Sequence, residues 1–334
     1  MGGYTQSSTP AVLHRYGAIL RLRTAASPAV LPTALGLPVM VWQVVFFAAP
    51  LLFLIVITFW QVRSFRLEPA FVMDNWSRIL GSTTFYRALT HTLRVSVTTT
   101  ILALVIAFPA AYTISFRLPA RLRDLTVALL IVPIFSSYLL RIYAWQIMLS
   151  PQGIANSLIA RMGGNPLELL GGDFSMQVGM LTLTLPVVVL ILIFALSGLD
   201  RTLIEAAENL GCRRIRVIAH VILPAIRPAL MLAGSTAFLL SFGDYISPLF
   251  MTGSKPPTLS ILIVDTVKSG AQWPRASVIG VAMLVILAVA FGLSRLFGDA
   301  GMTRSIRQRF ARARVSSRAA TQTAATPIAK EGCR

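Results

Sequence analysis

Six long apolar runs constrain the fold of this chain more than any other feature. An α-helix needs roughly 20 predominantly apolar residues to span a bilayer, whereas strands of a membrane β-barrel are about half as long and alternate in polarity. The runs do not alternate, and a soluble domain of 334 residues with 55% hydrophobic residues would leave much apolar surface in water. We therefore predict an all-α integral membrane protein, a six-transmembrane-helix bundle over 39–298, with spans at 39–60, 95–116, 124–149, 176–197, 228–250 and 277–294.

The net charge of +18 is concentrated in the segments between and beyond these runs. With the N-terminus placed inside, the inner segments hold 20 Lys and Arg residues and the outer segments hold 9. Cytoplasmic loops of membrane proteins carry such an excess, so we predict a multi-pass protein with both termini in the cytoplasm. A basic chain can also bind nucleic acid, but basic residues placed around apolar runs indicate topology, and we expect no nucleic-acid partner.

Two terminal segments lie outside the predicted bundle. Residues 1–38 are expected to form a cytoplasmic N-terminal tail. Residues 299–334 are basic, and we predict a disordered cytoplasmic tail. The alternative for its first part, up to Arg318, is an amphipathic helix on the inner leaflet, because apolar residues are interspersed among the arginines.

The inner segment 198–227 has the pattern of a helix–turn–helix at the membrane surface. Its first part favours a helix with small alanines on one face, and Gly211 permits a sharp turn. Helix-compatible sequence then resumes at Arg213, and Pro224 is expected to end it before the next span. A small face beside a glutamate suits docking into a groove on another protein.

This segment also resembles the EAA loop of binding-protein-dependent ABC importer permeases. That pattern is Glu-Ala-Ala, three residues, Gly, nine residues, Ile, one residue and Leu-Pro. The chain matches it, with a valine in place of the isoleucine, at Glu205, Ala206, Ala207, Gly211, Val221, Leu223 and Pro224. The alternative is a solvated loop whose charges only set topology.

The resemblance implies a fold and a set of partners. The fold would be the type I ABC importer permease fold, in which this loop seats in a cleft of the ATPase subunit. The partners would be a second permease subunit, ABC ATPase subunits, a periplasmic substrate-binding protein and the lipid bilayer. The location would be the bacterial inner membrane. ATP with Mg²⁺ would be bound by the ATPase, and the chain itself would need no cofactor.

A narrower resemblance connects the chain from about Asn75 onwards to the spermidine/putrescine branch of these permeases. It is carried by 129–159, by 241–253 and by the stretch that begins at Trp273. It implies passage of a small solute such as a polyamine. The alternatives are the same architecture for another small solute (an amine, opine, phosphonate or metal ion) and a membrane scaffold that transports nothing.

The sequence lacks the motifs of an enzyme. It has no G-x-x-x-x-G-K-[ST] phosphate loop, no nucleophile elbow and no His, Cys or Asp cluster with metal-ligand spacing. We therefore expect a transport subunit with no catalytic residues and no metal site.

Two charged residues fall inside predicted spans, where charge is costly and commonly functional. Counted by helical rise from the outer ends of their spans, Arg141 lies roughly 12 Å and Asp244 roughly 9 Å below the outer end of the bundle. The two could form an ion pair that locks the bundle. Alternatively, Asp244 could contact a cationic substrate beside aromatic rings that attract ammonium groups, with candidates at Tyr143, Trp145, Phe242 and Tyr245.

Overall fold

The computed structural model describes residues 30–63 and 65–296, with the side chains of 30–36 left aside. They form two units that divide between Val72 and Met73, and each is described by itself. The predicted tail 299–334 and most of the predicted tail 1–38 lie outside the described residues.

The first unit is one apolar helix followed by a small hairpin. Its helix comprises α2 (Val30–Gln43), the π-helical turn η1 (Val44–Ala48) and α3 (Ala49–Ile57). The wide turn immediately precedes Pro50, which lacks the N–H that an α-helix would use there. Leu37–Ile57 is long and apolar enough to cross a membrane, in agreement with the predicted first span. The strands β1 (Gln61–Arg63) and β2 (Arg66–Glu68) then pair antiparallel.

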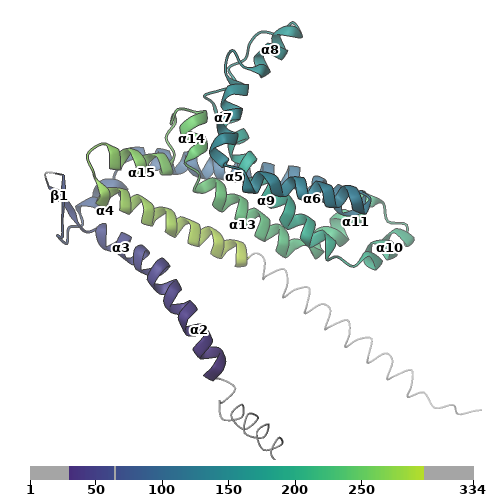
Figure 1. Ribbon diagram of the computed structural model, residues 1–334, viewed down its shortest axis with the longest axis horizontal. Helices are drawn as coiled ribbons and strands as arrows, with labels where there is room; N and C mark the ends of the chain where they lie inside the picture. Colours follow the sequence, from purple (N-terminus) through teal and green to yellow (C-terminus); the bar gives the residue numbers. More distant parts are fainter. Residues whose placement is uncertain (1–29, 64, 297–334) are drawn as a thin grey trace, which may run out of the picture. The chain divides into compact units, whose positions relative to one another are not determined.

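The second unit is a helix bundle built around α5, α9 and α13, which lie side by side (Figure 1). Three helices of this unit are each long and apolar enough to cross a membrane alone. They are Thr83–Phe116, Asp173–Ser197 and the last described helix, Trp273–Leu296. The unit's helices before Gly198 are α4 (Asp74–Leu80), α5 (Thr83–Phe116), α6 (Ala120–Phe135), α7 (Tyr138–Leu149), α8 (Ile154–Arg161) and α9 (Asp173–Ser197). Those that follow are α10 (Arg201–Asn209), α11 (Arg214–Val217), η2 (Ile218–Ile222), α12 (Leu223–Ala225), α13 (Arg227–Phe242), α14 (Ile246–Met251) and α15 (Leu259–Lys268).

The number of spans matches the prediction only if bent helices are counted as single spans. Across the described residues, four helices are long and apolar enough to cross a membrane, and two further helix pairs qualify together. The first pair, Ala120–Phe135 with Tyr138–Arg161, bends by 95°, and the second, Arg214–Ala225 with Arg227–Phe242, bends by 75°. Figure 1 shows α7 and α8 turned away from the direction of α6.

The prediction of continuous helices over 124–149 and 228–250 is therefore wrong. The third run breaks at Ser136 and Ser137, both with extended backbone, just after Pro133. The fifth run breaks after Phe242, so Asp244 lies between α13 and α14 and not on a helix. The depth of Asp244 below the outer end of the bundle therefore does not follow from the rise of a helix. Apolar composition does not reveal these breaks, because serine and glycine are tolerated in membrane helices.

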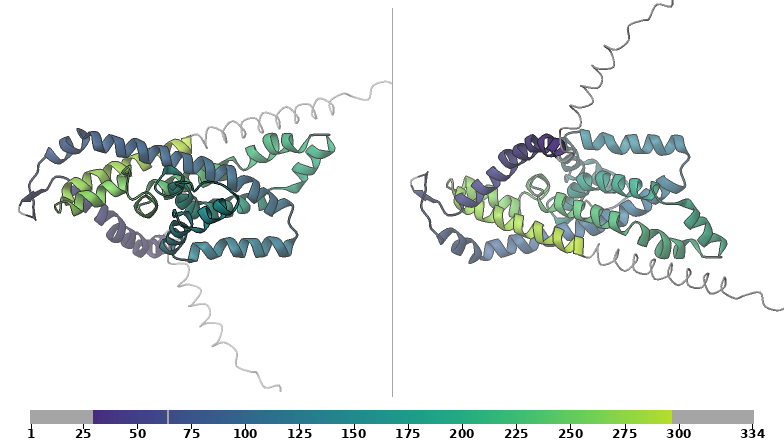
Figure 2. Two further views of the ribbon diagram at one scale, coloured as in Figure 1. Left: turned by 90° about the horizontal axis from the view of Figure 1, so that it is seen from above. Right: turned by 90° about the horizontal axis from the view of Figure 1, so that it is seen from below.

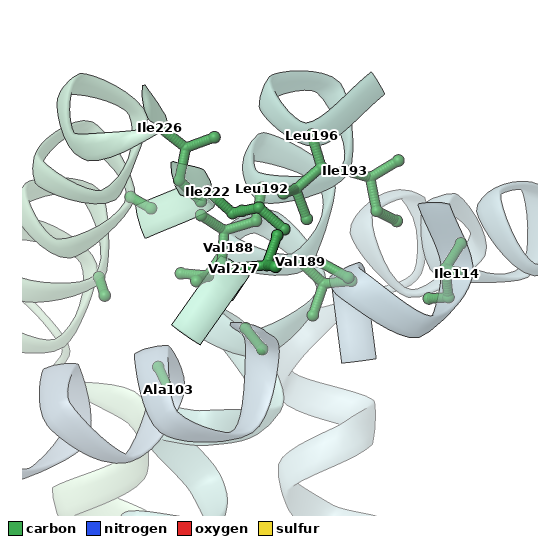
Figure 3. Close-up of a cluster of buried hydrophobic side chains, with 14 residues drawn as sticks. Ala103, Ile114, Val188, Val189, Leu192, Ile193, Leu196, Val217, Ile222 and Ile226 are labelled. Atoms are coloured by element: carbon green, nitrogen blue, oxygen red, sulfur yellow. The ribbon is translucent and has the colours of Figure 1, made fainter. Parts of the chain in front are cut away.

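Small residues bring the central helices together. Three of the fully buried alanines of α5 lie four residues apart, at Ala103, Ala107 and Ala111. This stripe lets the neighbouring backbones approach closely. The core continues into the 198–227 segment, where Val217, Ile222 and Ile226 face α9 residues such as Leu192 (Figure 3). The segment is thus anchored on the bundle by apolar contacts.

Polar side chains also join α5 to α9. The Thr99 hydroxyl donates to Gln177 Oε1 at 2.8 Å, and Gln177 Nε2 donates to the Thr98 hydroxyl at 2.6 Å. Nearer the starts of these helices, Asp173 accepts from Arg94 and lies 3.4 Å from His91 Nε2. These contacts fix the two helices against each other.

Candidate functional site

The 198–227 segment, called the coupling segment below, protrudes from the bundle as a hairpin. Both views of Figure 2 show it at the opposite end of the unit from α15. Asp200 begins α10 by accepting the Thr202 N–H at 3.0 Å, as an N-cap residue does. Ile204 and Ala207 pack against the core, whereas Glu205 and Ala206 are exposed. The first helix of the predicted helix–turn–helix therefore presents Glu205 outward.

The turn after α10 requires the glycine that the sequence supplies. Gly211 has φ +79°, in the left-handed region, and the next residue, Cys212, donates its N–H to Ala207 O at 3.2 Å. These are the features of a helix C-terminus closed by glycine. A Cβ at Gly211 would meet no atom within 4 Å, so the backbone conformation alone excludes larger residues.

The return limb differs in detail from the prediction. Pro224 was expected to end the helix, but the helix continues to Ala225. Pro224 has no N–H to donate to the preceding turn. That turn is the π-helical η2, in which the Leu223 N–H donates to Ile218 O. Val221 is half-buried against the core, whereas Leu223 and Pro224 are exposed. The motif positions thus divide into residues that anchor the hairpin and residues that face outward.

The exposed side of the coupling segment combines apolar and charged side chains. Leu203 is 47% and Leu210 84% exposed. Beside α10 lies a pocket of about 210 Å³, lined by Tyr112, Phe116, Arg117, Arg201, Ile204, Glu205, Glu208 and Arg214. An exposed leucine pair beside charged residues is the composition expected of a surface that another protein covers.

The second candidate region surrounds Asp244, which is only 7% exposed. Its Oδ1 accepts the N–H groups of Ile246 at 2.9 Å and Ser247 at 3.4 Å, at the start of α14. Its Oδ2 accepts the Tyr138 hydroxyl at 2.7 Å. The break in the fifth run thus meets the break in the third run, because Tyr138 is the first residue of α7.

Three elements converge on the Tyr138 hydroxyl. It lies 2.5 Å from Ser247 Oγ and 3.5 Å from Gly179 O of α9. A Cβ on Gly179 would lie 2.7 Å from Ser247 Oγ, so only glycine permits this approach. We call Tyr138, Gly179, Asp244 and Ser247 the polar cluster.

Arg141 does not form the ion pair that was one of the two alternatives. Its Nη1 donates to Thr182 O at 2.9 Å, and its guanidinium carbon lies 5.6 Å from the centroid of the Tyr138 ring. No ion pair joins it to Asp244 in the part of the chain that the structure describes. Its Nε is buried and has no hydrogen-bond partner there. The aspartate and the arginine are therefore linked only through Tyr138.

The predicted aromatic candidates make contacts of their own. Phe242 is fully buried and stacks on Phe238, with ring centroids 5.4 Å apart. Tyr143 packs against Phe250 at 4.9 Å. Trp145 and Tyr245 are half-buried, and among residues 65–296 no hydrogen bond joins either to the carboxylate. The aromatic residue whose hydroxyl donates to Asp244 is Tyr138, which was not among the predicted candidates.

A signal for these missed residues exists in the sequence. Tyr138 follows two serines in an otherwise apolar run, and Asp244 follows a glycine. Polar or flexible residues at corresponding depths of two spans are a pointer to broken helices that form a site. Gly179 carries no such signal, because its role depends on a contact with a distant residue.

A family model described as "binding-protein-dependent transport system inner membrane component" matches residues 110–301, more than half of the chain. The chain belongs to this family. It is an inner-membrane transport permease of the ABC importer class, and the family is one of transport subunits, not enzymes. The match includes both the coupling segment and the polar cluster.

Several curated proteins are similar over most of their length. The spermidine/putrescine transport system permease protein PotB of Escherichia coli (strain K12) is 28% identical over 259 residues, covering 76% of this chain and 92% of that protein. PotB of Haemophilus influenzae is 25% identical over 252 residues, covering 74% and 87%. The putative 2-aminoethylphosphonate transport system permease protein PhnU of Salmonella typhimurium is 27% identical over 288 residues, covering 81% and 96%.

Solved structures share the fold. A bacterial ABC transporter that imports the acidic polysaccharide alginate matches with a TM-score of 0.63 at 21% identity, covering 82% of this chain and 98% of that chain. The same kind of transporter in complex with a periplasmic protein bound to alginate pentasaccharide matches with a TM-score of 0.64 at 18% identity, covering 79% and 92%. The predicted type I ABC importer permease fold, a bundle of membrane helices, is thereby confirmed.

Proposed function

We propose that this permease forms the membrane path for a cationic polyamine in an ATP-driven importer. The observation that carries the proposal is Asp244, a buried carboxylate with no cationic side chain paired to it among the described residues. Burial of a carboxylate is costly unless the carboxylate is both hydrogen-bonded and paired with a cation. Asp244 has the hydrogen bonds, and a cationic substrate would supply the paired charge. The similarity to the PotB proteins supports the same substrate class.

The proposal assigns the coupling segment to the ATPase. We infer that α10, with Glu205 and Ala206 exposed on it, docks in a groove of an ATPase subunit that binds ATP and Mg²⁺. The exposed leucines Leu203 and Leu210 would supply apolar contact, and Gly211 would hold the angle of the hairpin. A second permease subunit and a periplasmic binding protein complete the proposed importer, with no cofactor held by this chain.

The substrate is tested by uptake. The permease and its ATPase, second permease and binding protein would be expressed in cells that lack their own polyamine importers. Accumulation of labelled spermidine and putrescine would be measured against an Asp244→Asn importer. We expect uptake that depends on Asp244, and absence of polyamine uptake in the intact importer would refute the proposed substrate.

A second candidate substrate is a zwitterion such as 2-aminoethylphosphonate. It is favoured by Arg141, whose buried Nε has no hydrogen-bond partner among the described residues and lies on the same helix as Tyr138. A phosphonate could accept from this guanidinium while the amine met Asp244. Uptake of 2-aminoethylphosphonate, lost in Arg141→Gln, would establish this candidate in place of a polyamine.

The proposed orientation places both termini in the cytoplasm. A reporter fused after Arg201, in the coupling segment, should be cytoplasmic, and one fused near Gly164, between α8 and α9, should be external. The charge distribution between inner and outer segments motivates this orientation. An external signal from the Arg201 fusion would contradict it.

A further inference from the structure

The Tyr138 hydroxyl occupies a position surrounded by oxygen atoms. Asp244 Oδ2 lies 2.7 Å away, Ser247 Oγ 2.5 Å and Gly179 O 3.5 Å. The three acceptors come from the break between α13 and α14, from α14 itself and from α9. They are nearly enclosed, because Gly179 and Ser247 are buried and Asp244 is 7% exposed.

A phenol is a poor match for this set of acceptors. It carries one hydrogen and can donate to only one oxygen at a time, whereas a primary ammonium carries three N–H donors and a positive charge. An ammonium nitrogen placed where the hydroxyl lies could donate to all three oxygens, one of them a carboxylate. Hydrogen bonds between two charged groups are roughly twice as strong as neutral ones.

Two of the three acceptors are held in place by contacts that do not involve Tyr138. Asp244 Oδ1 is fixed by the N–H groups of Ile246 and Ser247, so the second oxygen keeps its direction. The Gly179 carbonyl belongs to the long helix α9, and the absence of a side chain allows Ser247 to approach. Removing the hydroxyl would therefore leave the Asp244 carboxylate and the Gly179 carbonyl in place.

Tyr138 itself is placed where it can move. It is the first residue of α7 and follows Ser136 and Ser137, whose extended backbone separates α7 from α6. A few residues at the end of an element commonly absorb the backbone change of a hinge. A rotation there would withdraw the hydroxyl from the acceptors and, because Tyr138 joins α7 to α14, would also release one helix from the other.

We propose that Tyr138 is a gate residue whose hydroxyl occupies the permease's site for a primary ammonium group and is displaced when the substrate enters. The proposal rests on the proposed function, since it specifies how a cationic amine would be recognised. The Arg141 guanidinium lies 5.6 Å from the centroid of the Tyr138 ring and donates to Thr182 O. Within residues 65–296 neither Arg141 nor another cationic side chain forms an ion pair with Asp244.

The gate is tested first without any substrate. The importer's two permeases and its ATPase would be purified into lipid nanodiscs, and ATP hydrolysis measured in the absence of binding protein. Tyr138→Phe removes only the hydroxyl and should raise this basal rate about fivefold, the effect of one lost hydrogen bond on a two-state equilibrium. Tyr86→Phe, on the exposed side of α5, removes the same atom from a ring that contacts Phe85 and should leave the rate unchanged. Equal rates in the two variants would overturn the gate.

The ammonium site is tested by direct binding. Putrescine and its fully N-methylated analogue, which has no N–H donors, would be compared by equilibrium dialysis against the same nanodiscs. Putrescine should bind at least about tenfold more tightly, and Tyr138→Phe should strengthen its binding because the competing hydroxyl is gone. Equal affinity for the two amines would overturn the ammonium site.

The two measurements separate this inference from the proposed function. The basal ATP hydrolysis rate requires no substrate, so a raised rate in Tyr138→Phe with no amine uptake would retain the gate and reject the polyamine assignment. Uptake of polyamine with an unchanged basal rate in Tyr138→Phe would retain the proposed function and reject the gate.

Discussion

The coupling segment and the polar cluster are organised in opposite ways. The coupling segment is continuous in sequence, and its turn depends on one residue, Gly211, with bonds to residues a few positions away. The polar cluster joins residues that are distant in sequence, since Tyr138 and Asp244 are 106 positions apart. A hairpin of the first kind is set by local backbone preferences, whereas a site of the second kind exists only when the bundle has assembled.

The largest effect expected from this difference is at Gly179. A valine there would place its Cβ 2.7 Å from Ser247 Oγ and 3.1 Å from Ile142 Cδ1, in a buried position. Overpacking of a core typically costs about 1–3 kcal/mol. Gly179→Val should therefore lower the yield of folded protein and its unfolding temperature in detergent.

The matched control for this substitution is Gly292→Val. Gly292 also lies in a long helix, Trp273–Leu296, but a Cβ there would meet no atom within 4 Å. Yield and unfolding temperature should stay close to those of the parent protein. Equal losses in the two variants would mean that α9 and α14 do not approach as closely as the structure places them.

The same contrast explains which features could be predicted from the sequence. Glu205, Ala206 and Gly211 lie on the predicted helix and turn because a small-residue helix followed by glycine is a local pattern. The breaks at Ser136 and Gly243 were not predicted, since a break is stable only if distant groups satisfy the freed polar atoms. Asp244 was identified by its charge, but its partner Tyr138 required the fold.

A second prediction concerns the charge of Asp244. Asn at this position can still accept the Ile246 N–H, and its amide can donate to the Tyr138 oxygen, so the fold should be kept. The contact with an ammonium would lose its charge, and hydrogen bonds to charged groups contribute about 1.5–3 kcal/mol. Uptake of labelled putrescine should fall at least about tenfold in Asp244→Asn.

The double variant decides whether Arg141 compensates for Asp244. Because Arg141 donates to Thr182 O and forms no ion pair with Asp244 in the described structure, adding Arg141→Gln should not restore uptake. Protein amount and unfolding temperature would be measured beside uptake. If uptake and unfolding temperature both recovered in the double variant, the two charges would be shown to pair in the membrane.

A third prediction tests whether the turn of the coupling segment depends on the backbone conformation of one residue. At Gly211, with φ +79°, an L-residue costs roughly 1–2 kcal/mol, and asparagine tolerates this region better than alanine or valine. Uptake and co-purification of the ATPase should therefore fall in the order Asn, Ala, Val, while the yield of inserted permease stays constant. If the losses of uptake and of co-purified ATPase instead followed side-chain size, with alanine the mildest, they would indicate a steric contact with the ATPase and not backbone strain.

The smallest effect is expected at the start of α10. Asp200→Ala removes the acceptor of the Thr202 N–H, and loss of an N-cap side chain typically costs about 1 kcal/mol. Hydrogen exchange should accelerate at Thr202 and Leu203, whereas Asp200→Asn, which keeps an acceptor, should exchange like the parent. Uptake should change by no more than about twofold, because Ile204 and Ala207 still hold α10 against the core. If Asp200→Ala instead lowered uptake as much as Gly211→Val, α10 would depend on its cap more than on its packing. The coupling segment would then be a marginal helix that the ATPase must complete, and the contrast with the polar cluster would be one of stability as well as of sequence distance.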